Sequence, residues 1–335
     1  MIEYVSVVVP VYNEEESILE CYQRLSDVLV TIGIEYELIF VNDGSTDQSI
    51  IILNSIASRD MHVTLIDLSR NFGKEIAVTA GLDVANGAAT VVIDADLQDP
   101  PELISAMISE WRTGTDVVYA QRTDRIGESW FKKATSHVFY RLLHGIKSVS
   151  IPRDVGDYRL LSKRAVMALR KFREHHRFMK GLFASIGFPQ KVILFQRDAR
   201  FAGKTKWNYW RLWNFALEGI TSFTTLPLRI SSYLGIAVAL VSMIYGMVVL
   251  VRTLMYGNPV AGYPSLLIAI LFLGGLQLIA IGVVGEYLGR VFNETKMRPL
   301  YFISSYKISS VVEEVNSNLN STTLQTVSEN RQEPS

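Results

Sequence analysis

The chain has 335 residues, of which 49% are hydrophobic, and its 33 basic residues balance its 33 acidic ones. This length allows one sizeable domain and an additional segment, and the hydrophobic content is high for a purely soluble enzyme. Because the net charge is zero, a nucleic-acid partner has no electrostatic support and we expect none. The single cysteine, Cys21, permits no internal disulfide, which agrees with a reducing compartment.

Three apolar strands are predicted in the N-terminal part, and each ends in a polar turn that leads into a helical pattern. The strands cover residues 5–9, 38–41 and 63–68, and the turns cover residues 10–14, 42–47 and 69–75. Strand, turn and helix in repetition predict an α/β domain with a mostly parallel sheet and crossover helices. Ligands of such sheets bind at the carboxyl ends of the strands, so these turns are expected to line one binding edge.

A fourth strand, residues 90–93, leads directly into Asp94 and Asp96. Two carboxylates one residue apart at the end of a buried strand can converge on one hard cation. Mg²⁺ or Mn²⁺ prefers such oxygen ligands and commonly shares a diphosphate, which indicates nucleotide-diphosphate chemistry. The alternative is that both residues only end the strand and cap a helix that starts near Pro101.

Six motifs follow one another along the chain: Pro10-Val-Tyr-Asn-Glu14, Val41-Asn-Asp-Gly-Ser-Thr-Asp47, Arg70-Asn-Phe-Gly-Lys-Glu75, Asp94-Ala-Asp-Leu-Gln-Asp-Pro-Pro101, Val155-Gly-Asp-Tyr-Arg-Leu-Leu161 and Phe201-Ala-Gly-Lys-Thr-Lys-Trp207. In this order they resemble the motifs of the family 2 inverting glycosyltransferases of the GT-A (Rossmann-like) fold. Within that family the chain is similar to the polyprenyl-phosphate glycosyltransferases related to dolichol-phosphate mannose synthase and bactoprenol glucosyltransferase. The Gln/Arg-x-x-Arg-Trp motif of processive polysaccharide synthases does not occur in the sequence, which favours transfer of one sugar per cycle.

The resemblance implies roles for individual residues. A metal, Mg²⁺ or Mn²⁺, is expected on Asp94, Asp96 and Gln98. The donor nucleotide is expected on the following residues: Pro10, Tyr12, Glu14, Asp43, Lys74, Asp94 and Ala95. Asp157 is the first candidate for a catalytic carboxylate besides the metal-holding Asp96, and Asp154 is the second. Both Asp154 and Asp157 could instead be turn residues, since Asp and Gly are common in loops.

Basic residues are candidates for binding the donor diphosphate or the acceptor phosphate, because a guanidinium matches phosphate oxygens in a bidentate way. They are Arg122, Arg200, Lys204 and Lys206. The alternative is a basic surface near the membrane that anionic lipid attracts.

Two segments beyond residue 229 are long enough to cross a membrane. Residues 230–251 carry no charged side chain, and residues 264–285 contain only Gln277 as a strongly polar one. As helices, both span a hydrocarbon core of about 30 Å, which predicts a transmembrane hairpin rather than two buried helices of a soluble core. Basic residues flank the outer ends of the pair, whereas the connecting loop offers only Arg252 at its edge. The positive-inside rule then places both termini in the cytoplasm.

Two further segments have the composition of interfacial amphipathic helices, at about residues 128–147 and 207–223. The first combines an apolar face with Lys132, Lys133 and Arg141, and the second is rich in tryptophan. The alternative for both is ordinary packing on the soluble domain. We expect residues 1–229 to form the catalytic domain, 230–289 the membrane hairpin and 290–335 a cytoplasmic tail, disordered from about residue 309 because few apolar residues follow.

These observations predict an integral membrane enzyme that transfers one sugar, with inversion and with a metal, from a nucleotide-diphosphate sugar to a polyprenyl phosphate. UDP-glucose is the expected donor, and GDP-mannose or a UDP-amino-arabinose derivative is the alternative. Transfer to a protein or polysaccharide acceptor would keep the same donor site. A catalytically silent scaffold for a lipid-sugar flippase would not need the intact Asp94, Asp96 and Gln98. The sequence leaves open a homo-oligomer and a flippase partner.

Overall fold

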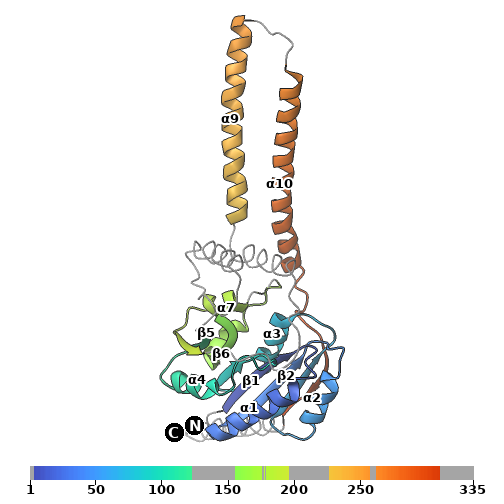
Figure 1. The fold of residues 1–335 in the computed structure, drawn as a ribbon, viewed down its shortest axis with the longest axis vertical. Coiled ribbons are helices and arrows are strands. Elements are labelled where there is room, and N and C mark those ends of the chain that lie inside the picture. Colours follow the sequence, from blue (N-terminus) through green and yellow to red (C-terminus); the bar gives the residue numbers. More distant parts are fainter. Residues whose placement is uncertain are drawn as a thin grey trace, which may run out of the picture. The chain divides into compact units, whose positions relative to one another are not determined.

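The computed structural model describes residues 4–122, 155–175, 177, 179–195, 226–256 and 262–309. The chain divides into two compact units, one made of residues 1–207 and 299–335 and the other of residues 208–298 (Figure 1). The two predicted interfacial helices, residues 128–147 and 207–223, lie outside the described residues.

The first unit is built on one eight-stranded sheet in the order β7-β5-β6-β4-β1-β2-β3-β8. Neighbours β4, β1, β2 and β3 are parallel, as are β5 and β7, whereas β6 is antiparallel to β4 and β5. The strands are β1 (Tyr4–Val11), β2 (Glu35–Asn42), β3 (Val63–Leu68), β4 (Ala89–Val92), β5 (Val117–Arg122), β6 (Val155–Ser162), β7 (Gln190–Phe195) and β8 (Ile303–Lys307). The predicted α/β fold with a mostly parallel sheet is confirmed.

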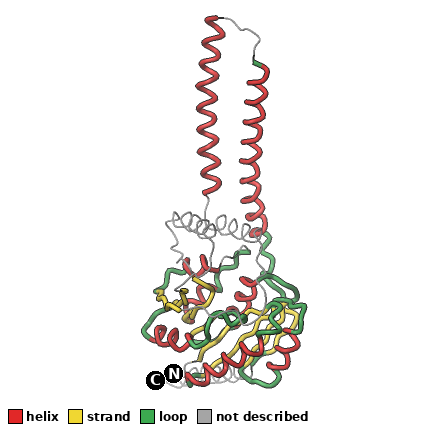
Figure 2. The backbone as a smooth tube through the Cα atoms, viewed as in Figure 1, coloured by secondary structure: helices red, strands yellow, loops and turns green. Residues whose placement is uncertain are grey.

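Helices cover the sheet, so β1 is buried over its whole length and β2 is buried from Tyr36 to Asn42. The helices of this unit are α1 (Ile18–Ile32), α2 (Ser49–Ala57), α3 (Lys74–Val84), α4 (Leu103–Arg112), α6 (Lys163–Leu169) and α7 (Met179–Ser185) (Figure 2). α1 buries Ile18, Leu25 and Leu29 against alternate residues of β1, because its apolar residues recur every three or four positions. α3 packs on strands β1 and β2, and a Cβ added at its Gly81 would lie 2.3 Å from Val8 Cγ1.

The last strand, β8, was not among the predicted strands. The sequence analysis assigned residues 290–335 to a tail, but residues 303–307 pair antiparallel with β3 at the edge of the catalytic sheet. All five side chains of β8 are exposed. An exposed edge strand does not need the apolar alternation by which strands are recognised in a sequence, so no pattern marked this one.

The second unit is a pair of long apolar helices, α9 (Leu226–Tyr256) and α10 (Tyr263–Thr295). They contain the predicted spans 230–251 and 264–285 and extend beyond them. By length and composition, Ser231–Val248 and Phe272–Thr295 could each cross a membrane, and neither stretch is buried within the structure. Their exposed apolar surface suits lipid and argues against two core helices of a soluble domain.

Candidate active site

The turns after β1 and β2 are locked together by side chains that bond to backbone groups. The Asn13 amide oxygen accepts a hydrogen bond from Thr46 N at 2.8 Å, and Asn13 N donates to Ser45 Oγ at 3.0 Å. Asn13 itself has a φ of 53°, in the left-handed region that Asn tolerates better than most residues. Pro10 lies in β1 and Tyr12 directly after it, with 39% of Tyr12 exposed. The predicted donor residues of these two turns therefore share one edge of the sheet.

Asp43, which follows β2, fixes the next loop along this edge. Its carboxylate is buried and accepts hydrogen bonds from Phe72 N at 2.7 Å and Gly73 N at 2.9 Å. Burial raises the pKa of Asp43, although these two N–H donors favour the ionised form. The loop of residues 69–73 also lies tightly against Gly44, where an added Cβ would be 2.4 Å from the carbonyl carbon of Arg70.

The turn after β4 carries Asp94, Ala95, Asp96 and Gln98. Gln98 N donates to Asp96 Oδ1 at 3.2 Å, and the intervening Leu97 is buried with a φ of 57°. Such a conformation is uncommon for a large side chain and costs free energy, and it persists only where the surroundings impose it. It occurs here between Asp96 and Gln98, two of the three residues that the sequence predicts as metal ligands.

Lys74, the first residue of α3, joins two of the predicted site carboxylates. Its Nζ lies 2.6 Å from Asp94 Oδ1 and 2.6 Å from Asp157 Oδ2. Residues 74, 94 and 157 come from α3, the turn after β4 and strand β6, so the fold assembles them from distant parts of the chain. The structure thus brings together Asp94, Asp157 and Lys74, as the predicted common site requires.

The electrostatics of this cluster are set by close opposite charges. Burial disfavours the charged form of Asp157, but Lys74 and Lys180 outweigh it and hold the pKa of Asp157 well below its usual range. Burial likewise opposes the charged form of Lys74, and Asp157 and Asp94 raise its pKa. The other oxygen of Asp157, Oδ1, is buried and has no hydrogen-bond partner within the described residues. Asp157 is therefore an ionised carboxylate with one accepting position available.

A second layer of charged residues surrounds this cluster and was not predicted from the sequence. Burial and the charge of Asp157 raise the pKa of Glu75 to about 8, although a backbone hydrogen bond from Met179 favours ionised Glu75. Burial lowers the pKa of Lys180, and burial lowers that of Arg159 to about 10. The Arg159 guanidinium lies 3.7 Å above the ring of Phe183. Glu75 belongs to the recognised Arg70–Glu75 motif, whereas no signal in the sequence distinguished Lys180 from a surface lysine.

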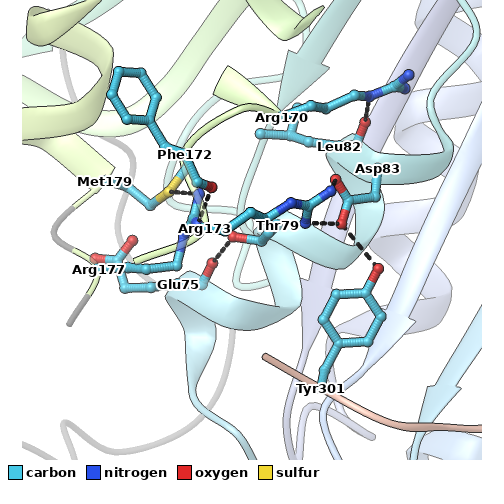
Figure 3. A network of polar contacts seen from close by, with 10 residues as sticks. All are labelled: Glu75, Thr79, Leu82, Asp83, Arg170, Phe172, Arg173, Arg177, Met179 and Tyr301. Carbon is cyan, nitrogen blue, oxygen red and sulfur yellow. Dashed lines mark hydrogen bonds and ion pairs between the residues drawn. The ribbon is translucent and has the colours of Figure 1, made fainter. Parts of the chain in front are cut away.

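The opposite end of α3 is held by a network of arginine side chains (Figure 3). Arg173 forms a bidentate ion pair with Asp83: Nη1 lies 2.7 Å from Oδ2 and Nη2 lies 3.0 Å from Oδ1. Arg170 donates to the carbonyls of Leu82 and Ala85, which satisfies acceptors at the C-terminus of the helix. Tyr301 Oη donates to Asp83 at 3.0 Å from the segment that precedes β8. The helix that carries Lys74 is thus fixed at both ends.

The remaining predicted residues are those proposed to bind phosphate and the second carboxylate candidate. Arg122 is the last residue of β5, beside Phe195 of β7. Three other predicted phosphate-binding residues lie outside the described residues: Arg200, Lys204 and Lys206. The second carboxylate candidate, Asp154, also lies outside them.

The acidic turn after β4 fits a divalent cation that is shared with a ligand. Asp94 and Asp96 offer oxygen donors of the kind that Mg²⁺ and Mn²⁺ prefer. Among the described residues, no group of three or more His, Cys, Asp or Glu side chains is placed to hold a metal alone. A site with two protein carboxylates suits a cation whose other ligands are phosphate oxygens and water.

Comparisons with known proteins identify the family. Residues 6–170 match the model of glycosyl transferase family 2, and residues 226–291 match the GtrB C-terminal hairpin. An uncharacterized glycosyltransferase of Synechocystis is 50% identical over 89% of this chain and 94% of its own length. The bactoprenol glucosyl transferase of Shigella phage SfV is 47% identical over 90% of this chain and 99% of its own, and that of Shigella phage SfII is 47% identical over 89% and 97%.

The similarity to these relatives extends over nearly the whole length of both chains. The chain therefore belongs to the family 2 glycosyltransferases, in the group that carries the GtrB C-terminal hairpin and includes the bactoprenol glucosyl transferases.

Proposed function

We propose that this glycosyltransferase moves a single glucosyl residue from UDP-glucose to a polyprenyl phosphate, with inversion, at the cytoplasmic face of a membrane. The observation that carries the proposal is the convergence of Asp94, Lys74 and Asp157 at the carboxyl edge of the sheet. The relatives named bactoprenol glucosyl transferase support the acceptor class and the sugar. The apolar hairpin supports an acceptor that resides in lipid.

The donor is proposed to lie along the turns after β1, β2 and β4. Pro10, Tyr12, Glu14 and Asp43 border the position of the base and ribose, and Asp94, Ala95 and Lys74 border the diphosphate. Asp94, Asp96 and Gln98 would hold Mg²⁺ or Mn²⁺, and a divalent cation bound there neutralises the charge that develops on the leaving diphosphate. The ammonium group of Lys74 lies against Asp94, where it adds a second positive charge to the same region.

The role of Asp157 follows from its ionisation. A phosphate monoester has a second pKa of about 6, so the acceptor is largely dianionic near neutral pH and needs little help to lose a proton. Because Lys74 and Lys180 keep Asp157 ionised against the cost of burial, it is a weak proton acceptor. We assign Asp157 to positioning: it holds Lys74 through Oδ2, and its buried Oδ1 has no hydrogen-bond partner among the described residues. Arg122, Arg200, Lys204 and Lys206 remain the proposed cationic contacts of the phosphates.

The donor and acceptor are tested with the purified full-length protein, polyprenyl phosphate and a panel of radiolabelled nucleotide sugars. We expect UDP-glucose to label the lipid-extractable product in the presence of Mg²⁺ or Mn²⁺. Labelling by GDP-mannose or UDP-amino-arabinose instead would correct the donor and retain the reaction. Nucleotide binding without transfer from any donor would contradict the enzyme and favour the silent scaffold.

A further inference from the structure

The segment that follows the hairpin in sequence, residues 301–309, attaches to the catalytic sheet at several points. Ser69 N donates to the carbonyl oxygen of Phe302 at 2.9 Å, and Tyr301 Oη donates to Asp83 at 3.0 Å. Ser309 N donates to Thr64 Oγ1, and Ser309 Oγ donates to the Met61 carbonyl oxygen at 2.6 Å. Between these points β8 pairs with β3. We call residues 301–309 the C-terminal clamp.

The clamp ends on the loop that forms part of the donor edge. Ser69, which bonds to Phe302, is the first residue of the loop 69–73, and the same loop gives the N–H groups of Phe72 and Gly73 to Asp43. Two residues before Ser69, Asp67 lies opposite Ser305 and accepts a hydrogen bond from Asn42 Nδ2 at 2.7 Å. Both residues 42 and 43 are thereby linked through β3 and its loop to the clamp.

The clamp also reaches the helix that carries Lys74. Tyr301 and Arg173 bind the same carboxylate, Asp83, in the last turn of α3, and Lys74 is the first residue of that helix. A helix of this length is a stiff rod of about 16 Å, so fixing one end restricts the other. The loop 69–73 leads directly into α3, so the two attachments act on consecutive parts of the chain.

These contacts differ from those that make the fold. All five side chains of β8 are at least partly exposed and none belongs to the hydrophobic core, so the strand is attached at the rim of the fold and is not part of its core. Its links to the catalytic unit are backbone and polar hydrogen bonds, each worth about a factor of two to twelve in an equilibrium. Loss of the clamp is therefore expected to loosen the loop 69–73 without unfolding the sheet.

We propose that the C-terminal clamp is a positioning element that sets the affinity for the donor nucleotide, with Tyr301 and Phe302 as its key residues. The inference rests on the proposed donor site along the turns after β1 and β2. α10 ends at Thr295 and the clamp begins at Tyr301, so only residues 296–300 separate the membrane hairpin from the element that shapes the donor edge. In this chain the sequence after the hairpin completes the nucleotide site.

The test uses two substitutions in the full-length protein, each with a matched control. Tyr306→Pro removes a backbone N–H and breaks β8 opposite Ile66, whereas Tyr306→Val places a good strand former at the same exposed position. Tyr301→Phe removes the hydrogen bond to Asp83, whereas Tyr22→Phe removes a 2.9 Å hydrogen bond to Asp60, which precedes β3 and so lies at the other end of that strand from the loop.

Two quantities are measured: the dissociation constant for UDP with Mg²⁺, and amide hydrogen exchange of residues 69–73 without nucleotide. For Tyr306→Pro we expect about tenfold weaker UDP binding, a comparable rise in the donor KM, kcat within about twofold of the unaltered protein, and faster exchange in the loop. Tyr301→Phe should show the same changes to a smaller degree, since Arg173 still holds Asp83. Both controls should behave like the unaltered protein.

Failure of this inference is separable from failure of the proposed donor. If the unaltered protein does not bind UDP, the proposed donor is wrong, but hydrogen exchange of residues 69–73 still tests whether the clamp holds the loop. Unchanged exchange of residues 69–73 in folded Tyr306→Pro overturns the clamp, and so does unchanged UDP affinity. A fall in kcat alone, with the donor KM preserved, also overturns it.

Discussion

At the scale of residues, the acidic turn after β4 carries the proposed metal. Asp96→Asn keeps the shape of the side chain but removes the charge that attracts a divalent cation. We expect transfer to fall nearly to the level left after chelation, while the thermal unfolding temperature stays close to that of the unaltered protein. The measurement is transfer with and without EDTA, beside a thermal melt. Substantial activity without metal would contradict the assignment of Asp94 and Asp96.

Glu75 gives a stability prediction with a definite sign. Its pKa is raised to about 8 by burial and by Asp157, above the value of a free carboxyl, so the folded protein binds an extra proton between those two pKa values. Unfolding then releases a proton, and this group makes the protein less stable as pH rises from about 4.5 to 8.

The substitution Glu75→Gln keeps an acceptor for Met179 N but cannot ionise. The unfolding temperature of Glu75→Gln minus that of the unaltered protein should therefore be larger at pH 8 than at pH 5. An equal difference at both pH values would show that Glu75 is ionised throughout.

Gly44 tests the close approach of the loop 69–73. Its φ of +62° strains any side chain, and an added Cβ would lie 2.4 Å from the backbone of Arg70, so Gly44→Ala must push the loop away. Gly33 has a φ of +71° with nothing within 4 Å of an added Cβ, and Gly33→Ala is therefore a control with similar backbone strain and no clash. We expect the affinity for UDP to fall by about tenfold or more in Gly44→Ala and to stay unchanged in Gly33→Ala. Equal affinities of the two variants would argue against a role for this loop.

At the scale of elements, the sequence predicted the repeated strand–turn–helix units and the apolar helices of the hairpin. Strands β1 to β4 end in polar turns, and this pattern was sufficient to place Asp43, Asp94 and Asp96 on one edge. The antiparallel β6 brings Asp157 to Lys74, but that contact joins residues 83 positions apart and depends on strand order, which local patterns do not specify. β8 was missed because five exposed residues at a sheet edge carry no hydrophobic period.

The hairpin leads to a prediction about topology. Basic residues precede α9 and follow α10, so the loop between the helices should lie on the non-cytoplasmic side and both termini in the cytoplasm. The cysteine of Asn258→Cys should react only with a membrane-impermeant thiol reagent added from the non-cytoplasmic side. A reporter fused after Ser335 should be active only in the cytoplasm. The reverse pattern would place the nucleotide-sugar site in the wrong compartment and contradict the proposed reaction.

At the scale of the whole molecule, one chain combines a glycosyltransferase fold with an apolar hairpin, and we propose that the two serve substrates of opposite character. The donor is water-soluble and highly charged, whereas the proposed acceptor is a phosphate on a lipid. The clamp of residues 301–309 shows that the hairpin is an insertion between parts of the catalytic unit in sequence, because the chain returns from α10 to complete the sheet. A soluble fragment ending before α9 would lack β8 and is expected to bind the donor weakly.

The central claim is that Asp157 and Lys74 form, with the acidic turn, the centre where the sugar is transferred. The most direct test is the rate of glucosyl transfer to polyprenyl phosphate by Asp157→Asn at saturating UDP-glucose, with UDP affinity measured on the same folded sample. The account predicts a rate lowered by about 10²-fold, because loss of the carboxylate misplaces the acceptor. It predicts UDP affinity nearly unchanged, because Asp94 still pairs with Lys74. Transfer at a rate near that of the unaltered protein would contradict it.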